Sequence, residues 1–347
     1  AGCDHMGNFP TLPIAGALRV SPDSILNMQT PVGKEIGTAG YYAATVDHSI
    51  RAELTVTERT GMARYTFSSK EKQGTVIIGG GVAATSIQVA AIKITGPHSC
   101  EGYAEGGAFC GIPTPYKVYF VAEFDADAES FGTWKEERLH ANHTFAEGNH
   151  SGVYFTFPLK EGNQAVQYKI GVSYVSVENA RENLRVENPA WDFSAVRQAT
   201  QDKWNEYLGK IEVEGDNEDR QMQFYTHLYR SLIHPNVCSD VNGEYMGADS
   251  QVHKTARKFY TSFSNWDTYR TQTALIAMLA PEETSDIVMS HYLFAEQSGG
   301  GFPRWVLANI ETGVMQGDPT PILVANAYAF GCLLYTSPSP RDPKTSR

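Results

Sequence analysis

Hydrophobic and polar residues alternate along the first half of the chain. In Val166–Val172 every second residue is apolar, as a strand with one buried face requires. Turn residues such as Thr60-Gly61 and Gly79–Gly81 separate short runs rich in β-branched and aromatic residues. From these runs we predict strands at Tyr41–Asp47, Arg51–Glu58, Met62–Phe67, Thr75–Ile78, Ile87–Ile94, Lys117–Phe124, Gly152–Pro158 and Val166–Val177. Regular strands with no helical pattern between them predict an antiparallel β-sandwich over residues 1–188.

A helical period begins after this region. Apolar residues within Phe193–Leu208 recur every three or four positions, and Asp192 and Gly209 suit the start and the end of a helix. A second helix is predicted to follow Asp216, which would cap its N-terminus. Between the two helices, Lys210–Glu214 is predicted to form a brief strand.

Further helices alternate with long loops that carry Trp, Asp, Arg and Glu. The pattern predicts helices at Thr271–Leu279, Pro281–Gln297 and Ile322–Phe330, with polar loops at Gly299–Trp305 and Asn309–Pro321. Helical hairpins in series can close into an α/α toroid whose loops line a pocket at one end. The predicted domains are a sandwich (1–188), a helical linker (189–215), the start of a toroid (216–331) and a tail (332–347).

The tail does not fit a folded domain. Three prolines in Thr336–Pro343 break any helix, and Tyr335–Asp342 resembles a translated sequencing adaptor. We therefore predict that residues 332–347 are not native. The chain also begins at Ala1 without Met or a basic and apolar leader, so we expect its N-terminus to be a cut end.

Composition excludes several classes of protein. The chain has 347 residues, 41% hydrophobic and 19% charged, which argues against disorder and allows two cores. A net charge of −11 disfavours a nucleic-acid groove, because phosphate would be repelled. No run of 18 apolar residues could cross a membrane. Aromatic residues make up 11%, which suits a carbohydrate-handling surface and a β-rich core equally.

The cysteines and one acidic turn raise the question of metal and disulfide sites. The five cysteines (Cys3, Cys100, Cys110, Cys238 and Cys332) form no C-x-x-C pair, so a structural zinc site is not expected. Cys100 and Cys110 flank a Gly-rich loop and fit either a disulfide or two buried thiols. Asp240, Asn242 and Glu244 alternate like calcium ligands, but the spacing does not match a calcium loop. We interpret Asn242-Gly243 as a turn.

The run Asn265-Trp266-Asp267-Thr268-Tyr269-Arg270 changes the picture most. At this spacing Trp266, Asp267 and Arg270 can project together from the first turn of a helix. Sugar pockets combine an aromatic plane for C–H faces with charged groups for hydroxyls. The alternative is a capped helix with Asp267 at its positive end and Trp266 in the core. Spacing alone favours the capped helix, whereas the β-to-α change and the loops around Trp305 and Asp318 favour the sugar pocket.

Five motifs occur in a fixed order along residues 1–331. They are Gly2-Cys3-Asp4, Tyr41-Tyr42 with Ala52–Thr55, Phe224–Arg230, Phe263–Thr271, and Pro303–Trp305 leading to Met315–Asp318. On these motifs the chain resembles glycoside hydrolase family 92, the calcium-dependent exo-acting α-mannosidases.

The resemblance implies a fold, an activity and a cofactor. The expected fold is an α+β multidomain arrangement, in which an N-terminal antiparallel β-sandwich precedes the first helices of an (α/α)6 toroid. The expected activity is removal of terminal α-linked mannose, notably α-1,2-linked, with inversion of configuration and the help of calcium (Ca2+). Its partners would be mannose-containing glycans, and the family suggests a secreted or periplasmic protein.

The resemblance also limits what can be assigned. The general-acid Glu and general-base Asp of the family lie beyond Gly331, so no catalytic residue and no metal ligand is assigned and the isolated chain is expected to be inactive. The substrate-binding residues that it implies are Trp266, Asp267, Arg270, Arg304, Trp305, Glu311 and Asp318. For the last four, loop-stabilising hydrogen bonds and packing at the rim remain an equal alternative.

Two other functions stay open at the level of sequence. The β-rich half could be a non-catalytic carbohydrate-binding module, because its aromatic content allows it. An α/α-toroid enzyme could instead act on another glycoside, or be a phosphorylase.

Overall fold

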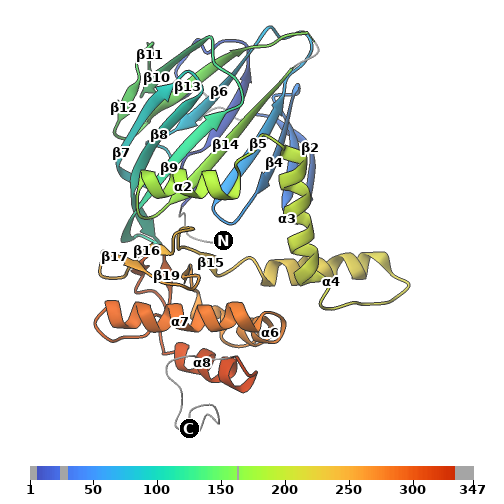
Figure 1. Ribbon diagram of the computed structural model, residues 1–347, viewed down its shortest axis with the longest axis vertical. Helices are drawn as coiled ribbons and strands as arrows, with labels where there is room; N and C mark the ends of the chain where they lie inside the picture. Colours follow the sequence, from blue (N-terminus) through green and yellow to red (C-terminus); the bar gives the residue numbers. More distant parts are fainter. Residues whose placement is uncertain (1–5, 24–29, 162–163, 333–347) are drawn as a thin grey trace. The chain divides into compact units, whose positions relative to one another are not determined.

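The computed structural model describes residues 6–23, 30–161 and 164–332 (Figure 1). The chain forms two compact units, and each is described by itself. The first unit contains Ala1–Glu206 and Ser239–Tyr245; the second contains Tyr207–Cys238 and Met246–Arg347. The domain boundaries predicted at residues 188, 215 and 331 stay a prediction.

Two antiparallel sheets make up most of the first unit. The smaller sheet has the order β1 (Thr11–Ala15), β6 (Gln73–Gly79), β13 (Ser151–Pro158), β10 (Ser130–Lys135) and β11 (Arg138–Ala141). The larger sheet has the order β12 (Phe145–Glu147), β7 (Ile87–Gly96), β8 (Ser99–Phe109), β9 (Ile112–Phe124), β14 (Ala165–Ser173), β5 (Thr60–Thr66), β4 (Ile50–Val56), β3 (Tyr41–Val46) and β2 (Val32–Thr38). Every strand predicted within residues 1–188 is present, and the predicted sandwich is confirmed.

Aromatic side chains fill the space between the two sheets. The ring of Phe124 on β9 lies 5.0 Å from that of Phe155 and 4.9 Å from that of Phe157, both on β13. All three are almost fully buried, as is Trp134 on β10. Removing such rings from water stabilises each by about 1.5–3 kcal/mol, which makes the alternating pattern the main determinant of this core.

Six of these strands escaped the sequence analysis, and β8 shows why. It contains Gly102, Gly106 and Gly107, and glycine carries no strand preference. Gly102 is required by close packing, because a Cβ there would lie 2.2 Å from the Ala91 carbonyl oxygen of β7. The close approach of the neighbouring strand requires glycine here. The segment therefore lacks the alternating apolar residues from which a strand is predicted.

A helix interrupts the region predicted to be entirely β. The predicted strand Val166–Val177 ends at Ser173, and α2 (Val177–Glu187) follows, with the Ser176 hydroxyl accepting from the Asn179 amide at 3.0 Å. The buried side chains Ala180 and Leu184 pack with Val121 of β9. The Ser176 cap and the buried positions Ala180 and Leu184, one turn apart, favour a helix here over an extended strand.

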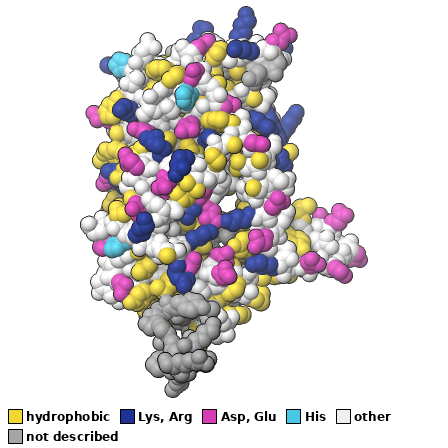
Figure 2. Space-filling view, viewed as in Figure 1, with side chains coloured by type: hydrophobic (Ala, Val, Ile, Leu, Met, Phe, Trp, Pro, Cys, Tyr) yellow, Lys and Arg dark blue, Asp and Glu magenta, His cyan; other side chains and the backbone are white. Residues whose placement is uncertain are grey.

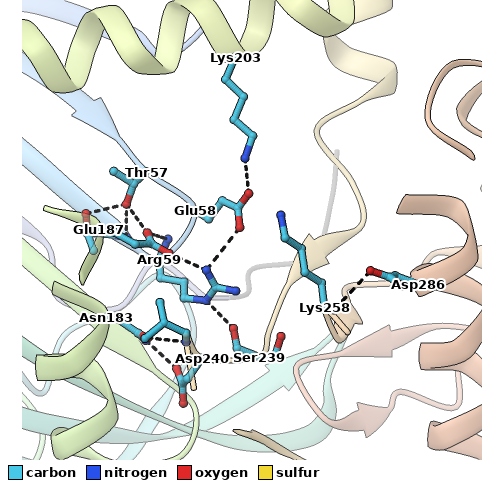
Figure 3. Close-up of polar contacts among 12 residues, drawn as sticks. Thr57, Glu58, Arg59, Asn183, Glu187, Lys203, Ser239, Asp240, Lys258 and Asp286 are labelled. Carbon is cyan, nitrogen blue, oxygen red and sulfur yellow. Dashed lines mark hydrogen bonds and ion pairs between the residues drawn. The ribbon is translucent and has the colours of Figure 1, made fainter. Parts of the chain in front are cut away.

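Segment Ser239–Tyr245 joins the first unit although the chain on either side belongs to the second. Its anchor is Asp240, which is 4% exposed (Figure 3). The Asp240 carboxylate accepts hydrogen bonds from the side chains of Ser173 (2.7 Å), Asn179 (2.8 Å) and Asn183 (2.6 Å). Burial raises the pKa of Asp240, while these donors and the charge of Arg59 lower it in part. The segment also contains the predicted turn, with the Gly243 amide donating to the Asp240 carbonyl at 2.9 Å.

Arg59 ties the same segment to the tip of the β4–β5 hairpin. Its guanidinium donates to the Ser239 carbonyl at 2.5 Å and pairs with Glu187 of α2 at 2.5 Å (Figure 3). Glu58, beside it, pairs with Lys203 of the next helix, α3 (Phe193–Leu208). Because Arg59 and Glu187 are mostly shielded from water, this network is worth more than a surface ion pair.

Helix α3 (Phe193–Leu208) has the predicted bounds. The Asp192 carboxylate accepts from the Ala195 amide at 2.9 Å, as its N-cap position predicted. Phe193 is buried with Tyr41 of β3, and the Arg197 guanidinium lies 3.6 Å from the centre of the Tyr41 ring.

The second unit is built from helices and short hairpins. Its helices are α4 (Glu218–Ser231), α5 (Asn265–Thr268), α6 (Gln272–Leu279), α7 (Pro281–Gln297) and α8 (Thr320–Ala329). Its short strands are β15 (Asn236–Val237), β17 (Val252–Lys254), β18 (Tyr260–Thr261), β19 (Val306–Leu307) and β20 (Ile310–Glu311). A further strand, β16 (Glu244–Met246), begins in the first unit and ends at Met246 of the second. The bounds predicted for α7 are confirmed, and α8 begins two residues before the predicted Ile322. The described helices fit the start of a helical domain, while closure into a toroid stays a prediction.

Two predictions near α4 are wrong. Lys210–Glu214 forms no strand, because the Tyr225 hydroxyl bonds the backbone there, donating to the Ile211 carbonyl at 3.2 Å. The N-cap of α4 is Asn217, one residue after the predicted Asp216, and its side chain accepts from the Arg220 amide at 3.0 Å. Figure 2 shows acidic side chains over this segment, where Glu218 and Asp219 occupy the first turn, which the helix dipole favours.

The cysteines divide between a disulfide and free thiols. Cys110 is disulfide-bonded, whereas Cys100 is a free thiol, so Cys100 and Cys110 do not pair. Cys100, Cys238 and Cys332 are all buried. Burial raises the pKa of Cys100, which makes its thiol inert. Cys332 packs in the core of α6, α7 and α8, while the rest of the predicted tail lies outside the described residues.

Among the residues that the structure describes, none of the helices combines the length and apolarity of a membrane span.

Replacing Asp240 with alanine is expected to destabilise the first unit by on the order of 3 kcal/mol, because three buried donors lose their acceptor. Urea unfolding of wild type and Asp240→Ala measures this difference. The matched control is Asp202→Ala, which removes an exposed carboxylate from α3 and should change stability by less than about 0.5 kcal/mol. Equal losses in the two variants would show that the Asp240 network is not an anchor.

Candidate functional site

The run Asn265–Arg270 is divided between a short helix and a turn. Its first four residues form a separate single-turn helix, α5, and a turn separates them from α6, which begins at Gln272. Trp266 and Asp267 thus lie in the single turn of α5, whereas Arg270 lies in the turn that follows it. The reason is tertiary: the Asn265 amide donates to the Arg304 carbonyl at 3.1 Å, and this pairing positions α5 apart from the longer helix.

The structure brings Asp267 and Trp305 together. The Trp305 indole nitrogen donates to an Asp267 carboxylate oxygen at 3.3 Å, across 38 residues of sequence. Asp267 is exposed and Trp305 is half-buried. An acceptor in water beside an aromatic plane is an arrangement that can bind hydroxyls and C–H groups at once.

Arg270 and Trp266 form the second group on the same run. The Arg270 guanidinium carbon lies 5.4 Å from the centre of the Trp266 ring and 5.2 Å from that of Tyr269. Its Nε also donates to the Tyr269 hydroxyl at 3.1 Å. Trp266 is half-buried rather than part of the core, so the alternative with Trp266 fully packed is not what the structure has. The cation is held by aromatic rings at an exposed position.

Arg304 and Glu311 support the loop that carries Trp305. The Glu311 carboxylate accepts from the backbone amides of Arg304 (2.8 Å), Trp305 (3.1 Å) and Gly313 (3.1 Å), across the β19–β20 hairpin. The Arg304 Nε donates to the Val314 carbonyl at 2.8 Å. Their contacts are thus those of the alternative interpretation, loop-stabilising hydrogen bonds.

Asp318 lies exposed in the segment before α8. Among the described residues, its side chain makes no hydrogen bond with another predicted site residue. The predicted set therefore divides into two joined pairs, Asp267 with Trp305 and Trp266 with Arg270, two loop supports and one separate carboxylate.

The sequence analysis missed the buried residues beneath the motif. Asn265 is 1% exposed and His291 is 0% exposed, and the His291 ring stacks on Phe263 with centroids 3.9 Å apart. Burial lowers the pKa of His291 to about 4, against a smaller opposite effect of its hydrogen bond with the Ile287 carbonyl. The sequence feature that could have indicated Asn265 is its place as a polar residue at the start of the motif. For His291, it is a histidine on the apolar face of α7.

A small pocket of about 30 Å³ lies beside α5. Its walls combine polar side chains, among them Thr268, Gln272 and His291, with apolar ones such as Phe263 and Ile276. The pocket lies wholly within the second unit.

A calcium ion needs several oxygen ligands, usually including carboxylates, within reach of one point. The part of the chain that the structure describes contains no group of three or more His, Cys, Asp or Glu side chains that could hold a metal ion. Asp240, the acid nearest to a calcium-loop pattern, is already bonded to Ser173, Asn179 and Asn183. These residues do not fit a calcium site by themselves.

Two family models match this architecture. The glycosyl hydrolase family 92 N-terminal domain matches residues 1–173, and the glycosyl hydrolase family 92 catalytic domain matches residues 179–338. The chain belongs to glycosyl hydrolase family 92. The candidate site thus lies within the part matched by the catalytic domain of family 92, and the motif-based resemblance is confirmed.

Solved structures of family 92 share the fold. A family GH92 α-mannosidase from Bacteroides thetaiotaomicron superposes with a TM-score of 0.84 and 23% identity, over 94% of this chain and 47% of that one. A family GH92 inverting mannosidase from the same organism gives a TM-score of 0.83 and 25% identity, over 95% and 44%. A secreted glycosidase of Arthroderma benhamiae is 26% identical over 78% of this chain and 37% of its own length. The chain therefore spans less than half the length of these relatives.

The stability of the second unit is expected to fall in acid because of His291. Its folded pKa of about 4 lies below the usual value of about 6.5. Folding thus favours the neutral ring, so this stabilising contribution is complete above about pH 6.5 and is lost as the pH falls toward 4. Between pH 7 and 4.5 the loss should be roughly 2–3 kcal/mol.

Urea unfolding at the two pH values measures this loss, with His291→Gln expected to remove it. His227→Gln, at an exposed position on α4, is the matched control and should keep the wild-type pH dependence. A wild-type loss that persists in His291→Gln would contradict the assignment.

Proposed function

We propose that the protein to which this chain belongs is an α-mannosidase that removes terminal α-linked mannose from glycans. Membership of family 92 supports a glycosidase, and the similar structures are those of α-mannosidases. The single observation that carries the proposal is the Asp267–Trp305 pair within the catalytic-domain match.

The geometry of this pair suits a sugar at the non-reducing end of a glycan. A carboxylate oxygen of Asp267 that is not engaged by Trp305 can accept from two neighbouring sugar hydroxyls. The half-buried faces of Trp305 and Trp266 can lie against the apolar C–H side of the ring, and Arg270 can donate to a further hydroxyl. Arg304 and Glu311 would act by holding the Trp305 loop, and Asp318 would contact the glycan at the rim.

Hydrolysis requires two further carboxyl groups that this site does not contain. An inverting glycosidase needs an acid to protonate the leaving oxygen and a base to activate water, roughly 6.5–9.5 Å apart. We propose inversion and a preference for α-1,2 linkages, and the inverting mannosidase among the similar structures supports the first of these. The residues of this chain would bind the sugar, while the acid and base would come from the remainder of the catalytic domain.

Calcium is proposed as a cofactor of the whole protein. The described residues hold no ready-made site, so most ligands would come from outside them. When bound, calcium would supply a positive charge that polarises sugar hydroxyls. A secreted or periplasmic location is also proposed, supported by the relative described as a secreted glycosidase.

The full-length protein is expected to release mannose from α-1,2-mannobiose, with activity lost in chelator and restored by added Ca²⁺. Chromatography of the products measures release, and proton NMR during turnover reports the configuration of the first product. Activity that is unchanged in chelator would contradict the proposed role of calcium. Turnover that depends on phosphate would instead identify a phosphorylase. No release from any α-mannoside would contradict the proposed substrate.

Asp267→Asn in the full-length protein is expected to lower kcat/KM for α-1,2-mannobiose by about 10–100-fold, since a charged hydrogen bond to the sugar contributes roughly 1.5–3 kcal/mol. Steady-state kinetics measure the change. Asp219→Asn, on the exposed first turn of α4, is the control and should retain wild-type kcat/KM. A similarly small change of kcat/KM in both variants would show that Asp267 does not contact the substrate.

A further inference from the structure

We propose that Asn265 is a positioning residue, whose side chain fixes Asp267 and Trp305 in one geometry for a mannoside. The inference rests on the proposed function for the identity of the ligand, but not for the geometry itself. Asn265 is buried beneath the exposed side chains and acts through the three parts of the chain that it joins.

Asn265 uses both its amide and its backbone for these contacts. Its Nδ2 donates to the Pro303 carbonyl at 3.0 Å and to the Thr320 hydroxyl at 3.0 Å, and its backbone amide donates to the Arg304 carbonyl at 3.1 Å. Asn265 itself begins α5, two residues before Asp267. One residue thus joins the helix of Asp267, the segment leading to Trp305, and the start of α8.

Neighbouring backbone contacts make this junction continuous. The Val306 amide donates to the Phe263 carbonyl at 2.8 Å, and Ser264 pairs with Trp305 as an isolated antiparallel bridge. The two segments therefore run antiparallel to each other from Phe263 to Asn265. Without its amide, the Pro303 carbonyl keeps only the Thr320 hydroxyl as a side-chain donor.

His291 of α7 contacts the remaining polar atom of the Asn265 side chain, its Oδ1. One ring nitrogen lies 2.7 Å from the Ile287 carbonyl oxygen and the other lies 3.1 Å from the Asn265 Oδ1. A neutral ring carries one proton and donates to only one of these oxygens at a time. Thr320 and His291 are both 0% exposed, so water cannot replace the Asn265 amide there.

A buried amide of this kind suits positioning better than bulk stability. Its partners are backbone and hydroxyl groups at fixed places, so a shift of either segment breaks at least one bond. The fixed position of the two segments maintains the 3.3 Å hydrogen bond between the Trp305 indole and Asp267. Its loss separates the aromatic plane from the carboxylate, and the sugar then loses one of its two simultaneous contacts.

The test compares wild type with Asn265→Ala, Asn265→Asp and the control Asn236→Ala, all in the full-length protein. Asn265→Asp keeps the volume and the oxygen facing His291 but loses both donated bonds. Asn236 is exposed on β15, and its side chain donates to the nearby Ile233 carbonyl at 3.1 Å. Nitrogen-15 NMR follows the indole N–H signals, and Trp305→Phe identifies that of Trp305.

The expected result is a Trp305 signal that moves in both Asn265 variants toward its position in Asp267→Asn. The signals of Trp134, Trp191 and Trp204, all in the first unit, should stay in place. Titration with methyl α-mannoside should show affinity weakened on the order of tenfold in Asn265→Ala and unchanged in Asn236→Ala.

A Trp305 signal that stays in place in Asn265→Asp overturns the positioning role, whatever the affinity. If Asn265→Ala loses its fold, Asn265→Asp and the milder Thr320→Val still decide the question by the same signal. If wild type binds no mannoside while the Trp305 signal moves as expected, the proposed substrate fails and the positioning role stands.

Discussion

A buried amide that must find partners governs the second unit. The Asn265 side chain lies out of water, where an unpaired polar group costs about 1–3 kcal/mol. That cost is avoided only when Pro303 and Thr320 lie at its Nδ2, and this requirement aligns three distant stretches of the chain. Asp267 and Trp305 face each other as a consequence of this alignment, since neither is buried enough to enforce their contact by packing.

The same constraint anchors segment 239–245 in the first unit. There the buried group is the Asp240 carboxylate, and its donors come from β14 and α2. Apolar burial forms the sandwich core, but it does not specify where a polar loop attaches. Paired polar groups supply that specificity in both units, because only one arrangement satisfies them.

Periodicity predicted much of the fold. The alternation in β14 and the helical spacing of α3 and α7 are local properties, so the ranges Phe193–Leu208 and Pro281–Gln297 could be predicted from neighbouring residues alone. Glycine-rich β8 could not, because its residues were selected by contact with β7 rather than by strand preference. Nor could the separation of α5 from α6, which depends on the pairing of Asn265 with Arg304 across 39 positions.

The candidate site shows the same division. Its chemistry could be predicted, because Trp, Asp and Arg within six residues suit a sugar whatever the exact helix bounds. The pairing of Asp267 with Trp305 could not, nor could the bonds that commit Arg304 and Glu311 to the loop, since both follow from contacts between segments. The buried Asn265 and His291 carried no local signal strong enough to distinguish them from core residues.

The most direct test of the account is saturation-transfer NMR on the full-length protein with methyl α-mannoside and methyl α-glucoside. The account predicts transfer to the ring protons of the mannoside, little transfer to the glucoside, and loss of the mannoside signal in the Asp267→Asn, Trp305→Phe double variant. Equal transfer to both sugars, or a mannoside signal that persists in a folded double variant, would contradict it.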